Sequence, residues 1–465
     1  MKARLLTIFA LSATLVGCTA GPDYAAPDLP AAPTWRQPVA TGPQSARPWW
    51  QSFNDPVLNR LETEALNANL SIEQALARLD QAQAASAAAG AARLPSAEAG
   101  ASAARAQQSL NAGLGQLSRF VPDFPRTVDN GSATFSGSWD LDLAGGLRRR
   151  QEAARAGTAE AQAGVIAARL AVSAELAQAY FRLRVAQAQG LALNELATRA
   201  RERQAIMAAR LSSGVASQAD AERTSAAAEQ AAAALPQISA RIEAERTRIA
   251  ILLGRSPSLP LDLDGAFSAD AADPVAGLPA AVLRARPDVA MAQARLISAN
   301  AAIGAAMAEY WPSVSLSALA GVQSNRFGQL FTGDSIAMQG ALGLRWRLFD
   351  FGRIDAQVAS ARGRNREMLA AYRETVLRAT GDVEVAQAAL IAARTALAST
   401  KAEVDLREAA RDRDKAALRA GAISRETLSA SQSALAEAQL RFAEARGNQA
   451  AALVDLSRAL GLQTW

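Results

Sequence analysis

Residues 132–143, SATFSGSWDLDL, alternate between apolar and polar side chains. Every second position from Ala133 to Leu143 carries Ala, Phe, Gly, Trp or Leu, and the positions between them carry Ser, Thr or Asp. Successive side chains of a strand point to opposite faces, so the pattern predicts a strand with one apolar and one polar face. Transmembrane barrel strands have this signature over about ten residues, although a half-buried strand of a soluble sheet alternates in the same way.

Three further segments alternate similarly. Residues 313–323 and 336–348 place Val, Leu, Ile, Met and Trp on one face and Ser, Gln or Arg on the other, and residues 96–103 are a weaker, Ala-rich example. We therefore predict strands at about 96–107, 132–143, 313–323 and 336–349. The intervening segments Gln107–Gly131 and Ser324–Ser335 contain Gly, Asn, Asp and Phe, and they are expected to form loops at the outer surface.

The two strand pairs belong to an internal repeat. When the chain is shifted by 207 residues, several Gly, Trp, Leu and Ser positions coincide without an insertion. The coinciding pairs are Trp139 with Trp346, Gly145 with Gly352, Leu170 with Leu377, Leu211 with Leu418, Gly214 with Gly421, Ser217 with Ser424, and Leu253-Gly254 with Leu460-Gly461. This predicts an α+β fold built from a duplicated unit of helix, two strands, helix, turn and helix. The repeats would cover 49–254 and 281–465, with a linker at 255–280.

The helical parts are Ala-rich and contain Leu, Arg, Glu and Gln, which are all good helix formers. Residues 147–212 contain no proline, and a continuous helix of that length would extend about 100 Å. Two apolar stripes meet near Tyr180, one with Leu170, Ala174, Ala177 and Phe181 and the other with Leu176, Tyr180 and Leu183. A helix that is apolar on two sides can pack between two neighbours. An ordinary helical bundle core is the alternative.

The N-terminus has the layout of a targeting signal. Lys2 and Arg4 precede the mostly apolar segment 5–16, which is too short to span a bilayer, for which about 20 residues are needed. The following Gly17-Cys18 resembles a bacterial lipobox. We therefore predict a signal peptide at 1–17 and lipidation of Cys18 with diacylglycerol and an N-acyl chain such as palmitate. Thr19 favours outer-membrane sorting, and the Pro-, Ala- and Gly-rich residues 18–48 would form a tether. A plain secretory peptide or a short anchor helix is the alternative.

Composition excludes several classes of function. The chain has one cysteine and no histidine, so an internal disulfide is impossible and the commonest metal ligand and general base are missing. Removal of residues 1–17 deletes two basic residues and no acid, which leaves a formal charge of 47 − 44 = +3. Gly145-Gly146 lacks the spacing of a nucleotide-binding loop. We expect no enzyme activity, no metal or other cofactor beyond the lipid on Cys18, and no nucleic-acid partner.

The membrane crossing is expected to use strands. Outside the signal peptide, the sequence has no uninterrupted apolar run of 18 residues. Four strands cannot close into a barrel, and unpaired strand edges are not tolerated in lipid. Closure therefore requires several copies of the chain, and three copies would supply 3 × 4 = 12 strands, an even number within the known range.

With this duplicated pattern, nearly the whole mature chain resembles the outer membrane factor (TolC-like) family, especially the lipoproteins of its efflux branch. The segments that carry the resemblance are Trp49-Trp50 with Phe53-Asn54-Asp55-Pro56, Leu283-Arg284-Ala285-Arg286-Pro287-Asp288-Val289, Trp346-Arg347-Leu348-Phe349-Asp350-Phe351-Gly352-Arg353, and Ala459-Leu460-Gly461. Each segment is weak evidence alone, but their order together with the duplication is specific.

The resemblance implies a homotrimer in the outer membrane. Twelve strands would form one β-barrel, which would continue into a long periplasmic α-helical barrel. The chain would act as a passive exit channel for drugs or toxic solutes, and so support antibiotic resistance, together with an inner-membrane efflux pump and a periplasmic adaptor protein. The alternatives are a duct of a protein secretion system and a structural coiled-coil lipoprotein.

Two helix hairpins turn at residues 211–217 and 419–424. Gly214 and Gly421 suit helix ends that need a left-handed residue, and Ser217 and Ser424 suit the N-caps of the following helices. The resemblance implies that these tips also contact the adaptor. The residues concerned are Leu211, Ser212, Gly214, Val215, Ser217, Arg419, Gly421, Ala422 and Ser424.

Three residues near the tips, Asp220, Glu426 and Thr427, are candidates for a periplasmic gate. The family often carries aspartates six and nine positions after the second tip glycine, but here those positions are Thr427 and Ala430. Asp220 lies six residues after Gly214, and Glu426 is a further acid. A ring of three such carboxylates would have raised pKa values, whereas a solvated acid in a first helical turn is an equal alternative. Asp140, Asp142, Arg345 and Arg347 are expected on the inward strand faces, either as part of the lumen or as interfacial charges.

Overall fold

The computed structural model describes residues 19–28, 33–36, 47–263, 271–272, 274–275 and 277–462. The predicted signal peptide, Cys18 and part of the predicted tether lie outside the described residues. The chain divides into two compact units. Unit 1 comprises Met1–Pro27, Asp80–Glu160 and Ala292–Ala371, and unit 2 comprises Asp28–Leu79, Ala161–Met291 and Tyr372–Trp465.

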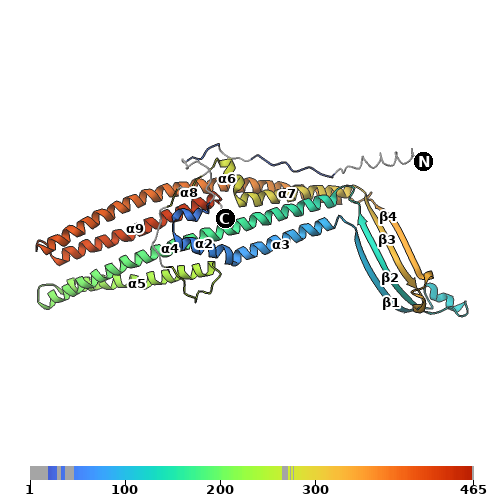
Figure 1. The fold of residues 1–465 in the computed structure, drawn as a ribbon, viewed down its shortest axis with the longest axis horizontal. Coiled ribbons are helices and arrows are strands. Elements are labelled where there is room, and N and C mark those ends of the chain that lie inside the picture. The colour runs from blue at the N-terminus through green and yellow to red at the C-terminus, as the bar shows by residue number, and fades with distance from the viewer. Residues whose placement is uncertain are drawn as a thin grey trace. The chain divides into compact units, whose positions relative to one another are not determined.

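Helices and strands follow one another in two similar series (Figure 1). The first series is η1 (Trp49–Phe53), α2 (Pro56–Ala68), α3 (Leu70–Ala91), β1 (Ser96–Gln107), η2 (Gly113–Arg119), β2 (Thr127–Asp140), α4 (Gly146–Ser212) and α5 (Gln218–Leu252). The second is α6 (Pro279–Ala285), α7 (Pro287–Met307), η3 (Ala308–Tyr310), β3 (Ser313–Ser324), η4 (Phe327–Gln329), η5 (Gly333–Ser335), β4 (Ile336–Arg345), α8 (Arg353–Arg419) and α9 (Arg425–Ala459).

The two helix hairpins, α4–α5 and α8–α9, have matching dimensions. Both α4 and α8 contain 67 residues, and both α5 and α9 contain 35. The starts of α4 and α8 differ by 353 − 146 = 207 residues, as do those of α5 and α9, since 425 − 218 = 207. The long proline-free stretch is therefore one continuous helix, as predicted. None of the helices in the described residues combines the length and the apolar character needed to span a membrane.

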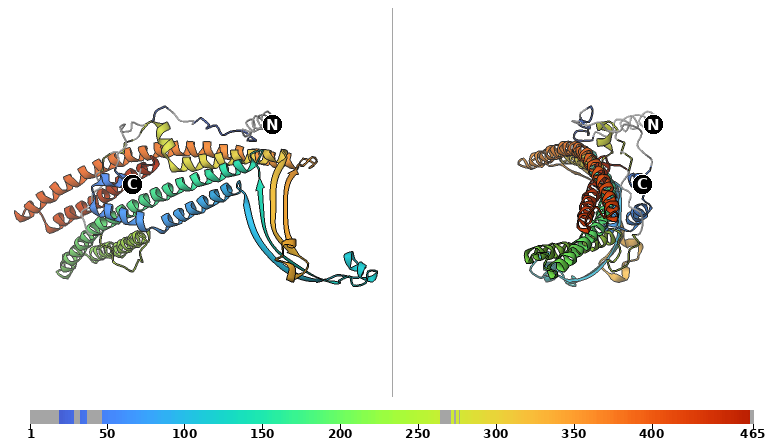
Figure 2. Two further views of the ribbon diagram at one scale, coloured as in Figure 1. Left: turned by 45° about the vertical axis from the view of Figure 1, so that its right-hand side comes forward. Right: turned by 90° about the vertical axis from the view of Figure 1, so that its left-hand side faces the viewer.

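Unit 1 contains one antiparallel sheet with the strand order β1-β2-β3-β4. The strands lie side by side in Figure 1 and curve together in the left view of Figure 2. Consecutive strands are neighbours throughout, and the register joins Ala101 to Ala133, Ala133 to Val322, and Val322 to Ile336. Within the described residues, β1 and β4 each have only one neighbouring strand, so the sheet ends in two open edges.

Strand β2 differs from its expected bounds. It begins at Thr127, where the sequence suggested a loop, because the ladder with β1 continues to the pair Gln107–Thr127. It ends at Asp140, and Leu141–Leu143 lie beyond it. The backbone of Asp142 is left-handed, with φ of 46°, which is incompatible with a continuing strand. The side-chain alternation extended past the strand into a turn.

Strand β4 is also shorter than expected, since it ends at Arg345 instead of near residue 349. Asp350 explains the difference. Its carboxylate accepts hydrogen bonds from the backbone N–H groups of Gly352 (3.1 Å) and Ile354 (2.8 Å), and so it caps the start of α8. The residues that follow Arg345 therefore belong to the connection into the helix.

Unit 2 holds the hydrophobic core. The short helix η1 contributes Trp49 and Phe53, and the ring centroids of Phe53 and Phe181 are 4.7 Å apart. Both predicted stripes of α4 are buried, from Leu170 to Phe181 on one side and from Leu176 to Leu183 on the other. The helix is therefore buried on two sides, as its sequence predicted.

Candidate functional site

The sheet of unit 1 has two chemically different faces, and the register keeps them separate across all four strands. One face pairs Ala97 with Gly137, Ala99 with Phe135, Trp139 with Leu316, Val314 with Leu344, Leu316 with Leu342, Ala320 with Met338, and Val322 with Ile336. The opposite face pairs Ser96 with Ser138, Glu98 with Ser136, Ser132 with Gln323, Asp140 with Ser315, and Leu319 with Gln339. The predicted alternation therefore produces one continuous apolar face and one largely polar face.

The apolar face is exposed, although it carries large side chains. Met338 is 79% exposed, Leu342 72% and Leu344 69%. Aromatic side chains gather at one end of this face, where the indole N–H of Trp139 donates to the carbonyl of Arg93 (2.9 Å) and that of Trp346 to the carbonyl of Tyr310 (3.1 Å). An exposed apolar face of this size marks a contact with lipid or another apolar surface.

An ion pair marks the other end of the apolar face. Arg105 and Asp129 are register partners, and the guanidinium donates to both carboxylate oxygens at 2.5 and 2.9 Å. They occupy the same face as Ala103 and Ala133, so the apolar stretch ends at charges in one direction and at Trp139 in the other. This is the order of side chains that a membrane-crossing strand presents to lipid and its two interfaces.

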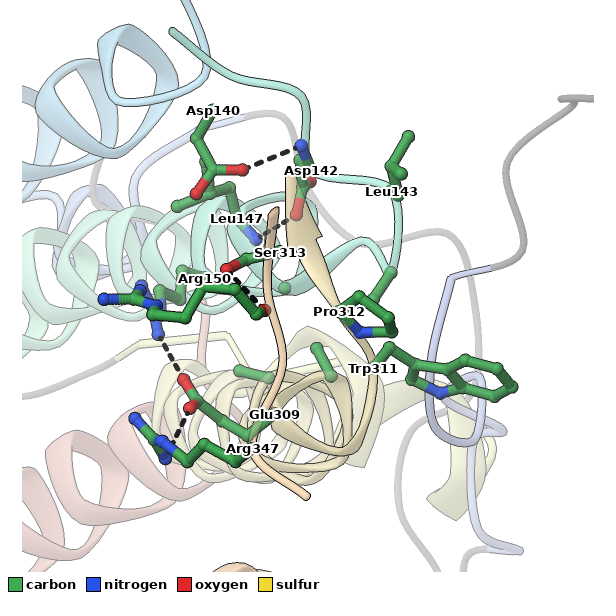
Figure 3. A pocket seen from close by; sticks show the side chains of 15 residues that line it. Asp140, Asp142, Leu143, Leu147, Arg150, Glu309, Trp311, Pro312, Ser313 and Arg347 are labelled. Carbon is green, nitrogen blue, oxygen red and sulfur yellow. Dashed lines mark hydrogen bonds and ion pairs between the residues drawn. The ribbon is translucent and has the colours of Figure 1, made fainter. Parts of the chain in front are cut away.

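A polar cavity of about 180 Å³ lies beside the aromatic end of the sheet (Figure 3). Glu309 connects two of its cations, with ion pairs to Arg347 at 3.0 Å and Arg150 at 3.6 Å. Asp140 and Arg345 also line the cavity. Charged groups from β2, β4, α4 and the segment before β3 are thus brought together, and Glu309 and Arg150 were not predicted from the sequence.

Two of the four charges expected on the inward strand faces lie elsewhere. Asp142 follows β2, and its carboxylate accepts hydrogen bonds from the backbone N–H groups of Leu147 (2.8 Å) and Arg148 (2.9 Å). It therefore stabilises the first turn of α4. Arg347 follows β4 and pairs with Glu309. Asp140 and Arg345 are the last residues of their strands, on the polar face.

The two helix tips of unit 2 have the same geometry. Gly214 and Gly421 have φ of 74° and 73°, which the absent Cβ permits. Two backbone hydrogen bonds close each helix end. At the first tip, the N–H of Gly214 donates to the carbonyl of Leu211 at 2.9 Å, and that of Val215 donates to the carbonyl of Arg210 at 2.9 Å. At the second tip, the N–H of Gly421 donates to the carbonyl of Leu418 at 3.0 Å, and that of Ala422 donates to the carbonyl of Ala417 at 2.9 Å. Both ends are Schellman motifs, as the glycines suggested.

Serines cap the helices that leave the tips. Ser217 Oγ accepts from the N–H of Asp220, and Ser424 Oγ accepts from the N–H of Thr427, both at 3.1 Å. These bonds satisfy backbone donors that a helix start otherwise leaves free. The tips are exposed, and Val215 retains 77% of its accessible surface. The capping role of the predicted tip residues is therefore visible, while the surface stays available to a partner.

The three candidate gate residues, Asp220, Glu426 and Thr427, have local partners, and the hydroxyl of Thr427 lies 3.1 Å from that of Ser424. Ser217 Oγ donates to the Asp220 carboxylate at 2.7 Å, and Arg223 forms an ion pair with it. The hydrogen bond from Ser217, reinforced by Arg223, lowers the pKa of Asp220. Glu426 pairs at 3.1 Å with Arg210, which is the last-turn cation of α4. Asp220 is thus an ionised residue of a first helical turn, and Glu426 connects the two hairpins of one chain.

A buried arginine organises the centre of unit 2. The Arg286 side chain is 8% exposed and donates to the carbonyls of Ala459 (2.6 Å) and Ala379 (3.3 Å), and it pairs with Asp382 (3.0 Å) and Asp288 (2.7 Å). It therefore connects α6 and α7 to α8 and α9. The Arg-Pro-Asp motif was part of the family resemblance, but periodicity did not reveal this bonding role.

No metal centre is evident in the described ranges, where His, Cys, Asp and Glu side chains form no group of three suited to a metal ion. The predicted lipid attachment residue, Cys18, lies outside them. The described residues offer a two-faced sheet, exposed helix tips and a charged cavity.

Comparisons with known proteins identify the architecture. The chain is 31% identical to the pyoverdine export outer membrane protein OpmQ of Pseudomonas putida, over 98% of this chain and 97% of the relative. It is 29% identical to the antibiotic efflux pump outer membrane protein ArpC of Pseudomonas putida, over 99% and 96%. The solved outer-membrane channel OprN superposes with a TM-score of 0.83 at 27% identity, covering 96% of this chain and all of that one. The outer membrane efflux protein family matches residues 61–255 and 278–462. This chain therefore belongs to the outer membrane efflux protein family.

Proposed function

We propose that the chain is a passive exit channel of a tripartite efflux system, which conducts small toxic solutes or drugs from an inner-membrane pump and a periplasmic adaptor to the outside. The observation that carries this proposal is the sheet of unit 1, with an exposed apolar face, a polar face and two open edges. Family membership supports it, because the relatives are named as outer membrane parts of efflux and export systems.

The open edges support a homotrimer. Backbone groups in a bilayer need hydrogen-bond partners within the protein, so β1 and β4 must pair with strands of other copies. Three chains would supply 3 × 4 = 12 strands and close the ring. The polar face, with Glu98, Asp140 and Arg345, would line the lumen, and the apolar face would contact lipid.

The length of the apolar stretch supports a membrane crossing. Trp139 and Asp129 are 139 − 129 = 10 residues apart on β2. Ten steps of about 3.3 Å give ~33 Å of strand. At the usual tilt of about 40°, the height would be ~25 Å, which is the apolar band of outer-membrane barrels. Trp139, Trp311 and Trp346 would then lie at the periplasmic interface.

The helices would continue the duct. The matching lengths of the two hairpins support a duplicated repeat, and three copies of them would give twelve helix segments around one axis, as a periplasmic helical barrel. The exposed tips would dock the adaptor through the residues from Leu211 to Ser217 and from Arg419 to Ser424. Asp220, Glu426 and Thr427 lie within one turn of the caps, so they are the candidates for a gate at the periplasmic mouth.

We propose that Cys18 carries the lipid and that the inner-membrane pump selects the transported solute. The relatives are named for pyoverdine export and antibiotic efflux, which are chemically different cargoes on one architecture. A polar duct with no cofactor chemistry is compatible with such breadth. The lipid would help address and assemble the channel, whereas the barrel would hold it in the membrane.

Deletion of the gene tests the efflux role. The deletion strain should become several-fold more sensitive to a panel of antibiotics, dyes and detergents, and the wild-type gene should restore resistance. In planar bilayers the purified protein should form stable pores, and Asp220→Ala should change cation block if Asp220 belongs to the gate. Unchanged sensitivity to every compound in a strain that expressed the protein beforehand would contradict the proposal, and unchanged block would remove Asp220 from the gate.

A further inference from the structure

Residues 19–24 are docked into unit 1, although their composition predicts a loose tether. The backbone N–H of Ala20 donates to the carbonyl of Ala144 at 3.0 Å. The side-chain amide of Asn300 on α7 donates to the carbonyl of Pro22 at 3.0 Å, and that of Gln293 to the hydroxyl of Tyr24 at 3.4 Å. Gln293 and Asn300 are two turns apart on one helix, so the segment runs alongside α7 as an extended strap.

Arg149 is the main polar contact of this strap. Its side chain is 5% exposed. The guanidinium donates to the carbonyls of Ala20 (3.1 Å) and Gly21 (3.2 Å), and it pairs with Asp23 at 2.7 Å and Glu152 at 2.8 Å. Three of these four partners belong to the strap. Without the strap, Arg149 would lose three of these four partners and would have to exchange them for water.

Glycines on both sides allow the strap to approach the helices closely. A Cβ on Gly21 would lie 2.4 Å from the Cα of Gly304, and a Cβ on Gly304 would lie 2.5 Å from the carbonyl oxygen of Ala20. Gly145, at the start of α4, would bring a Cβ to 3.0 Å from Thr19. The groove and the strap are therefore fitted to each other at the backbone level, independently of Arg149.

We propose that this groove is a docking site for the segment Thr19–Tyr24, and that Arg149 thereby positions the lipid-bearing N-terminus at the aromatic end of the sheet. The proposal rests on the lipidation of Cys18 in the proposed function. A free coil of the 30 residues from 19 to 48 would let the attachment point wander over about 30 Å. Docking replaces that freedom by holding Thr19, the residue that follows Cys18 in sequence, next to the connection between β2 and α4.

The rate at which chymotrypsin cleaves after Tyr24 measures docking directly, because this peptide bond lies within the strap. In the full-length protein extracted from outer membranes, wild type should resist this cut. Arg149→Ala and Gly21→Ala should be cut at least about tenfold faster, because local opening sets the rate of proteolysis. Arg155→Ala, an exposed arginine on the same helix, and Gly157→Ala, whose Cβ would meet open space, are matched controls and should resist like wild type.

The Gly21→Ala variant keeps the test decisive if loss of Arg149 impairs folding, since it alters the strap alone. Wild type that is cut as fast as folded Gly21→Ala would overturn docking. The intact mass of the purified wild-type protein tests the lipidation separately from the docking. An unmodified Cys18 in wild type would refute the lipidation, whereas the comparison of cleavage rates would still test the docking.

Membrane assembly tests the positioning role of Arg149. Arg149→Ala should retain the acyl mass on Cys18 but leave several-fold less protein resistant to alkaline extraction from outer membranes. Six Gly and Ser residues inserted between Cys18 and Thr19 should have the same effect on extraction while preserving resistance to chymotrypsin. Normal extraction behaviour of Arg149→Ala, despite rapid cleavage after Tyr24, would overturn the positioning role.

Discussion

The two units place their apolar side chains in opposite environments. In unit 2, Leu58 and Phe53 are 0% and 1% exposed within a core that gathers α2, α4 and α9. In unit 1, Leu342 and Met338 are 72% and 79% exposed on one face of a four-stranded sheet. Both units have regular, well-paired backbones, so the contrast reflects the surroundings for which each is built. Unit 2 buries a large apolar core and leaves single residues such as Leu191 exposed, whereas unit 1 exposes a whole sheet face that carries large apolar side chains.

The largest expected effect lies in the core of unit 2. Leu58→Ala removes a fully buried side chain and should lower the free energy of unfolding by about 2–5 kcal/mol, through lost burial and the cavity left behind. Urea denaturation of the detergent-solubilised protein measures it. Leu191→Ala on α4, where the side chain is 77% exposed, is the control and should change little. Equal effects of the two variants would contradict the assignment of the core.

The sheet of unit 1 offers a complementary test with two adjacent residues. Leu342→Arg places a charge on the apolar face and should destabilise the membrane-inserted state by about 2–4 kcal/mol. Ala341→Arg places the same charge on the face shared with Gln339 and should be tolerated. Insertion into lipid vesicles, followed by denaturant titration, compares them. If Ala341→Arg were the more harmful variant, the two faces would have been assigned the wrong way round.

A buried acid within unit 2 gives a smaller, pH-dependent effect. Burial raises the pKa of Glu62 well above its usual range, and the Ser173 hydroxyl lowers it only in part. The Ser173 hydroxyl forms no hydrogen bond of normal geometry with Glu62, and neither carboxyl oxygen has such a partner in the described residues, so the compensation for burial is weak. Above the ordinary pKa of about 4.3 the unfolded chain releases this proton and the folded chain keeps it, so stability should fall as pH rises towards the folded pKa.

Glu62→Leu should remove that pH dependence. At neutral pH the variant should gain about 1–3 kcal/mol, because the unsatisfied buried carboxyl is gone. Below pH ~4 the ionisation part of the difference should disappear, since both states of the wild type are then protonated. Thermal unfolding of both proteins from about pH 3 to about pH 8 measures the effect. A stability difference between wild type and Glu62→Leu that stayed constant over this range would exclude a buried neutral Glu62.

The smallest effects are expected at the tips, the most exposed part of unit 2. Ser217→Ala and Ser424→Ala should each destabilise the following helix start by about 1 kcal/mol. The loss should be greater for Ser217, which also donates to Asp220. Hydrogen exchange of the first turns of α5 and α9 reports both. An equal loss at the two tips would show that the bond to the carboxylate adds nothing to the cap.

Periodicity in the sequence located the strands and long helices but not all of their ends. Alternation placed β1 and β3 within one residue of their bounds, because successive side chains point to opposite sheet faces along the whole of each strand. It misplaced the ends of β2 and β4, where Asp142 and Asp350 terminate the ladder by capping the next helix. A carboxylate can continue an alternating pattern and still act as a cap, so the pattern could not distinguish the two roles.

The polar contacts between distant segments were not predictable from the pattern. Arg149 reads as one of three consecutive arginines, and only the fold shows that it is buried against residues 20–23. Arg286 is a similar case, since its partners come from α8 and α9. The tip residues were identified more readily, because Schellman motifs and serine caps are local and leave a signature within six residues.

The open edges of the sheet have a consequence for the chain before it reaches the membrane. An uncovered strand is a template for pairing with the wrong partner. Strand β1 carries Glu98 and Arg105, which discourage such pairing, whereas β4 carries no charge before Arg345 and presents Ile336, Met338 and Leu342. Before the sheet finds its partners, β4 is therefore the edge that is more prone to aggregation.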